Sequence, residues 1–249
     1  MKTQSYKERV MKSYSVLFIG NSYTYFNDMP SIFKGMAESL GYDVTVESIT
    51  SGGYKLSQYC DPQNPFGAKV KMALSGEKRY DFVVLQEQSI RPASENAPDF
   101  FASVRQLVGK IKSVNATPVL YSTWGRRAGC DTLDEYGWTN ESMTYKLAAA
   151  YRAIGKEQGA LVADVGLAFF DVNKRHAEID LYDPDKSHPS PSGSFLAAAT
   201  ILIKTLGGKL NESVYAGELN KSEASILYSA ANRVTSGEIE IPSEYEIKL

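Results

Sequence analysis

Cysteine and histidine are scarce in this chain, which has only two of each among its 249 residues. A secreted disulfide scaffold or a zinc site normally needs more of them. We therefore expect Cys60 and Cys130 to be free thiols, with one bridge between them as the alternative. We also expect no metal and no cofactor.

Net charge and long apolar runs are also lacking. Lys and Arg number 27 against 29 Asp and Glu, which gives a formal charge of −2 and no reason to expect a nucleic-acid partner. The longest apolar stretch, residues 195–203, is far shorter than the roughly 18 residues that cross a bilayer. We therefore expect no membrane partner.

The first nine residues contain charged side chains but no apolar region of the kind found in an export signal. The sequence as given therefore predicts a cytoplasmic protein. A secreted or periplasmic protein whose leader had been removed would begin in the same way.

No repeat or linker divides the chain, so we expect one domain over residues 1–249, with its core at about 14–234. Residues 235–249 would form a C-terminal tail, either irregular or a flap. Apolar runs that suit buried parallel strands alternate with segments of helical period. The strands are expected at residues 15–19, 44–49, 82–85, 118–122 and 161–165, and the helices near 32–40, 100–111, 143–154, 196–206 and 222–234. This alternation predicts an α/β fold with a five-stranded parallel sheet covered by helices on both faces.

The loops that follow the predicted strands contain the residues best suited to chemistry. Parallel sheets of this kind bind ligands beyond the carboxyl ends of their strands. The corresponding loops cover residues 20–24, 50–54, 86–89, 123–127 and 183–189, and they hold serine, glycine, glutamine, tryptophan, aspartate and histidine. We therefore expect the functional site at this edge of the sheet.

A serine nucleophile needs a histidine base and usually a carboxylate behind it. His176 lies in a charged stretch that suits the surface, whereas His188 follows Asp185 by three residues and precedes a proline. Ser22, in the first of these loops, is the candidate nucleophile. The alternative for each motif is purely structural: Ser22 as a helix N-cap, and Asp185 with His188 as a capping turn. Their placement at one edge of the sheet favours the catalytic interpretation.

The order of these motifs resembles that of the SGNH (GDSL-type) hydrolases. The resemblance covers residues 14–206 and depends on Gly20-Asn21-Ser22, a glycine after the second strand, an amide loop after the third, and Asp185-x-x-His188-Pro189. It implies a flavodoxin-like three-layer α/β/α sandwich. It also implies that Ser22 attacks an ester carbonyl, that His188 acts as base and then acid, and that Asp185 orients the imidazole.

The resemblance further implies an oxyanion hole built from three donors. The family uses the backbone N–H of the nucleophile, a glycine N–H after strand two and an asparagine side chain after strand three. The first two positions become Ser22 and Gly53 or Gly52. The usual Gly-x-Asn-Asp of the third block is absent, so the third donor is either Gln88, which falls at the asparagine's position, or Gln86, which resembles the glutamine of some carbohydrate esterases and is slightly preferred.

The substrate is less well defined by the sequence. Tyr54 and Trp124 could stack on sugar rings, and Arg126 and Arg127 could hold an anionic group, although a charged pair in such a loop is usually solvated. The sequence favours a serine ester hydrolase, a carbohydrate O-deacetylase or short-chain acyl esterase, acting on a small-molecule or carbohydrate ester. The alternatives are a catalytically silent sugar-binding relative, an acyltransferase, and a flavin- or nucleotide-binding protein. Against a flavin- or nucleotide-binding protein, this sequence lacks the glycine spacing of phosphate-binding loops at residues 20–24.

Overall fold

A five-stranded sheet forms the centre of the structure, a computed structural model that describes residues 12–207, 210 and 215–249. All strand pairs are parallel, and the order across the sheet is β2-β1-β3-β4-β5. The strands are β1 (Ser13–Gly20), β2 (Asp43–Thr50), β3 (Phe82–Leu85), β4 (Thr117–Tyr121) and β5 (Leu161–Ala163). This order is the flavodoxin-like one, so the predicted fold class is confirmed. The nine N-terminal residues used above to judge export lie outside the described residues.

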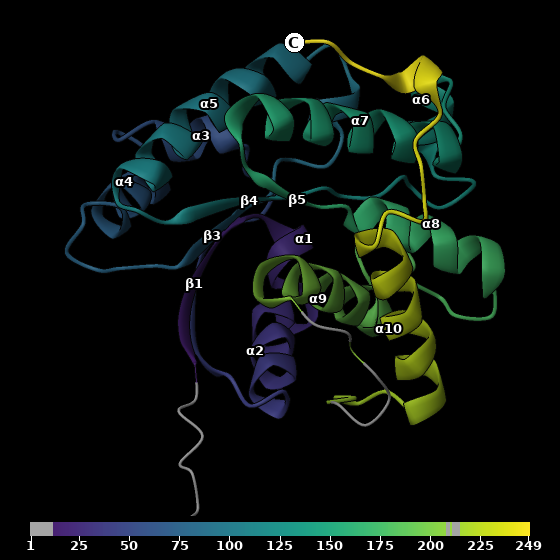
Figure 1. The fold of residues 1–249 in the computed structure, drawn as a ribbon. Coiled ribbons are helices and arrows are strands. Elements are labelled where there is room, and N and C mark those ends of the chain that lie inside the picture. Colours follow the sequence, from purple (N-terminus) through teal and green to yellow (C-terminus); the bar gives the residue numbers. More distant parts are fainter. Residues whose placement is uncertain (1–11, 208–209, 211–214) are drawn as a thin grey trace, which may run out of the picture.

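Helices cover both faces of the sheet (Figure 1). The described helices are α1 (Ser22–Tyr25), α2 (Met29–Ser39), α3 (Leu56–Cys60), α4 (Pro65–Ala73), α5 (Ala97–Ser113), α6 (Asp131–Tyr136), α7 (Asn140–Gln158), α8 (Val165–Arg175), α9 (Pro191–Leu206) and α10 (Lys221–Thr235). Short 3₁₀ turns occur at Phe26–Asp28, Arg91–Ala93 and Ser243–Tyr245.

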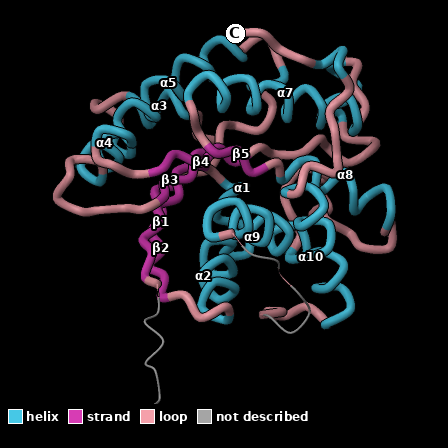
Figure 2. The backbone as a smooth tube through the Cα atoms, viewed as in Figure 1, coloured by secondary structure: helices cyan, strands magenta, loops and turns pink. Residues whose placement is uncertain are grey.

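The alternation of β1 side chains divides the core into two layers. Val16 and Phe18 point to the face packed by α2, α8, α9 and α10, whereas Leu17 and Ile19 point to the face packed by α3, α4, α5 and α7. Figure 2 shows the two helical layers on either side of the strands. Because Val16–Ile19 of β1 are buried on both faces, this part of the strand is continuously apolar rather than alternating.

The predicted and observed strands differ mainly at β5. The apolar run at residues 161–165 was expected to be strand throughout, but β5 ends at Ala163 and Val165 is the first residue of α8. Gly166 lies so close to the Thr123 carbonyl that a Cβ there would overlap it, which brings α8 tightly against the loop after β4. Helices α1, α3, α4, α6 and α8 were not expected.

The C-terminal tail runs along the outside of α7 and is irregular apart from the 3₁₀ turn at Ser243–Tyr245 (Figure 1). Tyr245 packs against Tyr145 of α7, with ring centroids 5.4 Å apart. Cys60 and Cys130 are free thiols, as expected, and burial raises the pKa of Cys60 to about 11. Among the described residues, none of the helices is long and apolar enough to cross a membrane.

Candidate active site

The turn after β1 holds Ser22 in a fixed position. Gly20 has no room for a Cβ, because the side chains of Thr24 and Gln86 lie against it. Asn21 caps α1: its Oδ1 accepts a hydrogen bond from the Tyr23 N–H at 3.1 Å. Ser22 is therefore the first residue of the helix and not its N-cap, so its hydroxyl is not used for capping.

Asn21 also ties this turn to the next loop, because its Nδ2 donates to the Tyr54 carbonyl at 2.9 Å. Sequence reasoning assigned Asn21 no role. A residue that caps a helix and bridges two loops at once cannot be distinguished from an ordinary N-cap by its type and position alone.

The loop before α9 places His188 opposite Ser22. Asp185 Oδ1 accepts hydrogen bonds from the backbone N–H groups of Ser187 and His188, both at 2.9 Å. Its other oxygen, Oδ2, lies 2.5 Å from His188 Nδ1. The spacing of three residues therefore lets one carboxylate fold the turn and hold the imidazole ring.

Ser22 and His188 meet although 166 positions separate them in the sequence. Ser22 Oγ lies 2.7 Å from His188 Nε2. The contacts from Ser22 to His188 to Asp185 form a continuous chain, with the two ring nitrogens facing the hydroxyl and the carboxylate. This is the arrangement in which a histidine can take the proton of a serine.

Aromatic rings fix the orientation of the His188 ring. Phe26 stacks on it with centroids 4.3 Å apart and planes 12° apart, and Tyr23 lies 5.3 Å away. Asn27, next to Phe26, donates to the Pro189 carbonyl at 2.9 Å, which fastens the two loops together. Phe26 and Asn27 were not singled out from the sequence, because aromatic and amide residues after a short helix give no distinctive signal.

Hydrogen bonds favour the charged form of Asp185. Burial by itself would raise the pKa of this carboxyl, but the bonds from the His188 ring and from the N–H groups of His188 and Ser187 outweigh it and lower the pKa. The carboxylate is therefore ionised at neutral pH, as is required to stabilise a positive imidazolium.

The serine and the histidine face a small pocket of about 210 Å³. The residues that line it come from all five of the loops predicted to gather at the carboxyl edge of the sheet: Asn21, Ser22, Tyr23, Gly53, Gln88, Ser89, Arg126, Ser187 and His188. Gly53 adopts a φ of 69°, a left-handed conformation that favours glycine. Gly52 is exposed and does not line the pocket.

One solved structure combines this fold with substantial sequence similarity. It is a protein from Slackia heliotrinireducens described as a candidate SGNH hydrolase, with 35% identity, a TM-score of 0.68, and an alignment covering 78% of this chain and 99% of that one. The chain belongs to the SGNH hydrolase family. No protein-family model matches the sequence, and a search of curated proteins finds no match either.

More distant structures share the fold of this SGNH hydrolase. A DUF4886 family protein from Bacteroides uniformis has a TM-score of 0.79 at 16% identity and covers 94% of this chain and 99% of its own. An acetyl-xylooligosaccharide esterase from Geobacillus stearothermophilus has a TM-score of 0.60 at 15% identity, with coverage of 84% and 99%. At these identities the likeness shows the fold alone.

The two candidate glutamines of the hydrolase occupy different environments. Gln86 is buried beneath the Ser22 turn, where its Oε1 accepts from the Asn21 N–H at 2.8 Å and from Thr24 Oγ1 at 2.9 Å, and its Nε2 donates to the Glu87 carbonyl. Gln88 lines the pocket, and its Oε1 accepts from the N–H groups of Ile90 and Arg91. The structure thus brings Gln88, and not the slightly preferred Gln86, to the pocket that Ser22 and His188 face.

Glu87, between these glutamines, is buried behind the pocket. Its Oε1 accepts hydrogen bonds from the Gln88 N–H at 2.7 Å and the Leu56 N–H at 3.2 Å, which joins the loop after β3 to α3. Burial raises the pKa of this carboxyl to about 7, despite the two backbone donors, which lower it. Sequence reasoning did not single out Glu87, since a glutamate between two glutamines looks like a solvated loop.

The two aromatic residues expected to stack on sugars are elsewhere. Trp124 is fully buried, stacked on Phe169 with centroids 3.9 Å apart, and its Nε1 donates to the Ser187 carbonyl at 3.1 Å. Tyr54 packs against Tyr59 in the second core layer. Neither residue lines the pocket. Trp124 instead holds the loop of His188 through its hydrogen bond to Ser187, and Tyr54 holds the loop of Gly53 in place by its packing.

Arg126, one of the two arginines that could hold an anionic group, lines the pocket and is buried rather than solvated. It is only 6% exposed, whereas its neighbour Arg127 reaches solvent and pairs with Asp180 at 2.7 Å. Residue type and position could not separate a buried arginine from a solvated one in the same loop.

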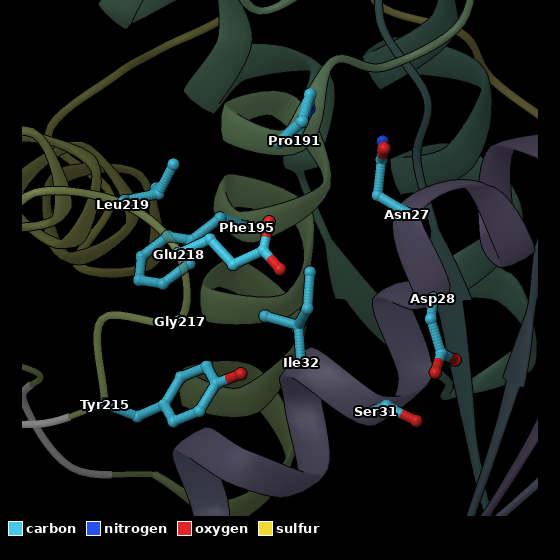
Figure 3. A pocket seen from close by; sticks show the side chains of 10 residues that line it. All are labelled: Asn27, Asp28, Ser31, Ile32, Pro191, Phe195, Tyr215, Gly217, Glu218 and Leu219. Atoms are coloured by element: carbon cyan, nitrogen blue, oxygen red, sulfur yellow. The ribbon is translucent and has the colours of Figure 1, made fainter.

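A larger cavity lies beside the hydrolase site, between α2, the start of α9 and the chain before α10 (Figure 3). Its volume is about 370 Å³, and its lining includes Ile32, Phe195 and Tyr215. It shares no lining residue with the pocket that Ser22 and His188 face. Among the described residues, no three His, Cys, Asp or Glu side chains gather as a metal site would require.

Proposed function

We propose that this SGNH hydrolase cleaves carboxylic esters through an acyl-enzyme formed on Ser22. The observation that supports the proposal most directly is the contact chain of 2.7 Å from Ser22 Oγ to His188 Nε2 and 2.5 Å from His188 Nδ1 to Asp185. A serine hydroxyl is a weak nucleophile until a base accepts its proton, and this geometry provides the base.

In the first step, Ser22 Oγ attacks the ester carbonyl carbon while its proton moves to His188 Nε2. The carbonyl π bond opens, and its electron pair becomes the oxyanion of a tetrahedral intermediate. Asp185, held ionised by its hydrogen bonds, stabilises the imidazolium that forms without taking its proton.

The oxyanion would be bound by the backbone N–H groups of Ser22 and Gly53 and by the Nε2 of Gln88. All three residues line the pocket, and the Oε1 of Gln88 is already held by backbone donors, which directs the amide. Each such donor contributes on the order of 10²–10³ in kcat. When the intermediate collapses, the alcohol leaves with the proton from His188, and water then hydrolyses the acyl-enzyme by the same route.

The substrate class proposed is a short-chain acyl ester of a carbohydrate or another small alcohol. A pocket of about 210 Å³ is below the roughly 300–1,000 Å³ of sites that enclose drug-sized ligands, which favours a short acyl group. The acetyl-xylooligosaccharide esterase that shares the fold makes acetylated sugars the first compounds to test.

Labelling with a fluorophosphonate and hydrolysis of p-nitrophenyl esters of increasing acyl length, alongside acetylated xylose, test this function. We expect covalent labelling of the peptide that contains Ser22 and the fastest hydrolysis of the shortest esters. Ser22→Ala should abolish both, while Ser57→Ala, at an exposed position of α3, should leave both unchanged. Labelling that persists in Ser22→Ala would refute the nucleophile.

A further inference from the structure

A buried arginine stands in the wall of the catalytic pocket. The Arg126 guanidinium lies 5.3 Å from the centroid of the Tyr23 ring, and its Nη2 donates to Ser89 Oγ at 2.8 Å. Tyr23 and Ser89 line the same pocket as Ser22 and His188. These contacts fix the positive charge beside the reacting groups.

This charge lacks an acidic partner. Within the described part of the chain, no carboxylate lies within ion-pair distance of Arg126, and its Nη1 is buried without a hydrogen-bond partner. Six other described arginines each pair with an aspartate or glutamate: Arg91, Arg105, Arg127, Arg152, Arg175 and Arg233. The nearby Asp185 attracts the guanidinium, but its two oxygens are engaged with His188 and the backbone of its own turn.

A buried cation without an anionic partner is costly, because burial removes its hydration and the hydroxyl of Ser89 and the ring of Tyr23 replace it only in part. Burial lowers the pKa of Arg126, yet arginine keeps its proton in proteins. Because the Arg126 guanidinium is fixed in the pocket wall and has no anionic partner in the described part of the protein, it is well suited to bind an anionic group of a ligand. Arginine favours carboxylates in particular, since its planar group donates two parallel hydrogen bonds.

We propose that Arg126 binds a carboxylate of the substrate, so that the preferred substrate is an ester that also bears a free carboxylate. This inference rests on the proposed esterase function and specifies its substrate. The carboxylate belongs either to the acyl group, as in a half-ester of a dicarboxylic acid, or to the alcohol, as in an acylated acidic sugar. Because the pocket is small, the carboxylate and the ester carbonyl must lie only a few bonds apart.

Two matched pairs of esters test the proposal and separate the two sources. The first pair is 4-acetoxybenzoate and 4-acetoxybenzamide, in which a carboxylate on the alcohol part is replaced by a neutral carboxamide. The second pair is monophenyl adipate and the phenyl ester of adipic acid monoamide, in which the carboxylate on the acyl part is replaced in the same way. We expect the native protein to hydrolyse the charged member of one pair about 10- to 100-fold faster in kcat/KM, the range of a charge-assisted hydrogen bond. Equal rates within both pairs would overturn the proposal while leaving the esterase intact.

Variants then assign the preference to one side chain. Arg126→Gln should reduce the ratio of charged to neutral rates to within about twofold, and Arg126→Lys should keep part of it. Arg127→Gln, at the exposed neighbour, should retain the native ratio. If Arg126→Gln slows both members equally, the guanidinium serves the transition state and not substrate choice, and the proposal fails.

An inhibition measurement on the native protein keeps the test independent of the stability of the Arg126→Gln variant. Adipate should inhibit hydrolysis of phenyl acetate competitively in the native protein, and adipamide should not. The absence of any ester hydrolysis and of fluorophosphonate labelling would instead refute the proposed function itself. If adipamide inhibits as strongly as adipate, the proposed carboxylate recognition by Arg126 is refuted, while the esterase function is not.

Discussion

Single residues decide which of the two histidines is the base. His188 contacts Ser22 and Asp185, whereas His176 lies at the end of α8, 3.2 Å from Glu178. We expect His188→Ala to lower kcat by about 10⁴–10⁶ with an unchanged circular dichroism spectrum, and His176→Ala to retain nearly full rate. Steady-state hydrolysis of phenyl acetate measures both. Full rate in His188→Ala together with loss of activity in His176→Ala would refute His188 as the base.

Substitution of Gln88 should change kcat, whereas substitution of Gln86 should change the free energy of unfolding. Gln88→Ala should lose about 10²–10³ in kcat with little change in melting temperature, because a donor to the oxyanion is lost. Gln88→Glu should lose as much, since it keeps an acceptor for Ile90 and Arg91 but has no N–H₂ group.

The contrasting variant is Gln86→Ala, which should lower the free energy of unfolding by about 1–3 kcal/mol, because the buried Asn21 N–H loses its acceptor. Urea unfolding and kcat, measured on all three variants, separate the two roles. A Gln88→Ala enzyme with full kcat would exclude Gln88 as the third donor.

Residue-level prediction from the sequence depended on local spacing. Asp185 and His188 lie three positions apart, so a turn alone brings them together, and the scarcity of histidine left few candidates. Gln86 and Gln88 are two positions apart and follow the same strand, so the period of a strand cannot separate them. The burial of Arg126 depends on tertiary packing, which no local pattern records.

Between elements, a buried carboxylate links α8 to α10. Asp171 of α8 is 5% exposed and contacts Arg233 of α10 at 3.0 Å and Arg175 of its own helix at 2.8 Å. A double-mutant cycle of Asp171→Ala and Arg233→Ala should give a coupling free energy of about 1–3 kcal/mol in urea unfolding.

The matched control is a double-mutant cycle on the exposed pair of Lys34 and Glu38 of α2. For this pair we expect a coupling free energy of about 0.5 kcal/mol or less. Equal coupling in the two cycles would show that the pair of Asp171 and Arg233 is not what holds the two helices together.

The elements themselves were predictable where their patterns were long. The helix expected at 222–234 is observed as α10 at Lys221–Thr235, and the strand expected at 82–85 is β3. Helix α8 was missed because the apolar run of β5 continues into its first turn, and residue type does not mark the change from strand to helix. The short α3 and α6 have too few turns to show a helical period.

For the molecule as a whole, Glu87 makes stability depend on pH. Its folded pKa of about 7 exceeds the ordinary value of 4.5, so between these pH values the folded state holds a proton that the unfolded state has lost. The free energy of unfolding therefore falls as pH rises through this window, by up to about 3 kcal/mol, and the loss is complete above pH 7.

Glu87→Gln removes this titration. The difference in free energy of unfolding between the variant and the native protein should shift in favour of the variant from pH 5 to pH 8, as measured by urea unfolding. Glu135→Gln, at an exposed position on α6, is the control. A difference for Glu87→Gln that does not change with pH would show that the carboxyl is not protonated in the folded state.

The whole-molecule architecture was the part most accessible from the sequence. Five apolar runs separated by helical segments lead to a parallel sheet, because parallel strands need crossover connections. The edge at which the functional loops gather follows from the same topology. The depth of the pocket and the neighbours of each side chain depend on packing between segments far apart in the chain, so they had to be observed.

The sheet order also has a consequence for the growing chain during synthesis. In the order β2-β1-β3-β4-β5, each new strand finds an already synthesised neighbour at the edge of the sheet, so the sheet can extend as the polypeptide leaves the ribosome. Ser22 emerges near the beginning, but its base is translated only after all five strands. An unfinished polypeptide would therefore carry the nucleophile without the group that activates it. Ribosome-bound chains arrested before residue 188 should escape fluorophosphonate labelling, and arrested chains that are labelled would contradict this order of events.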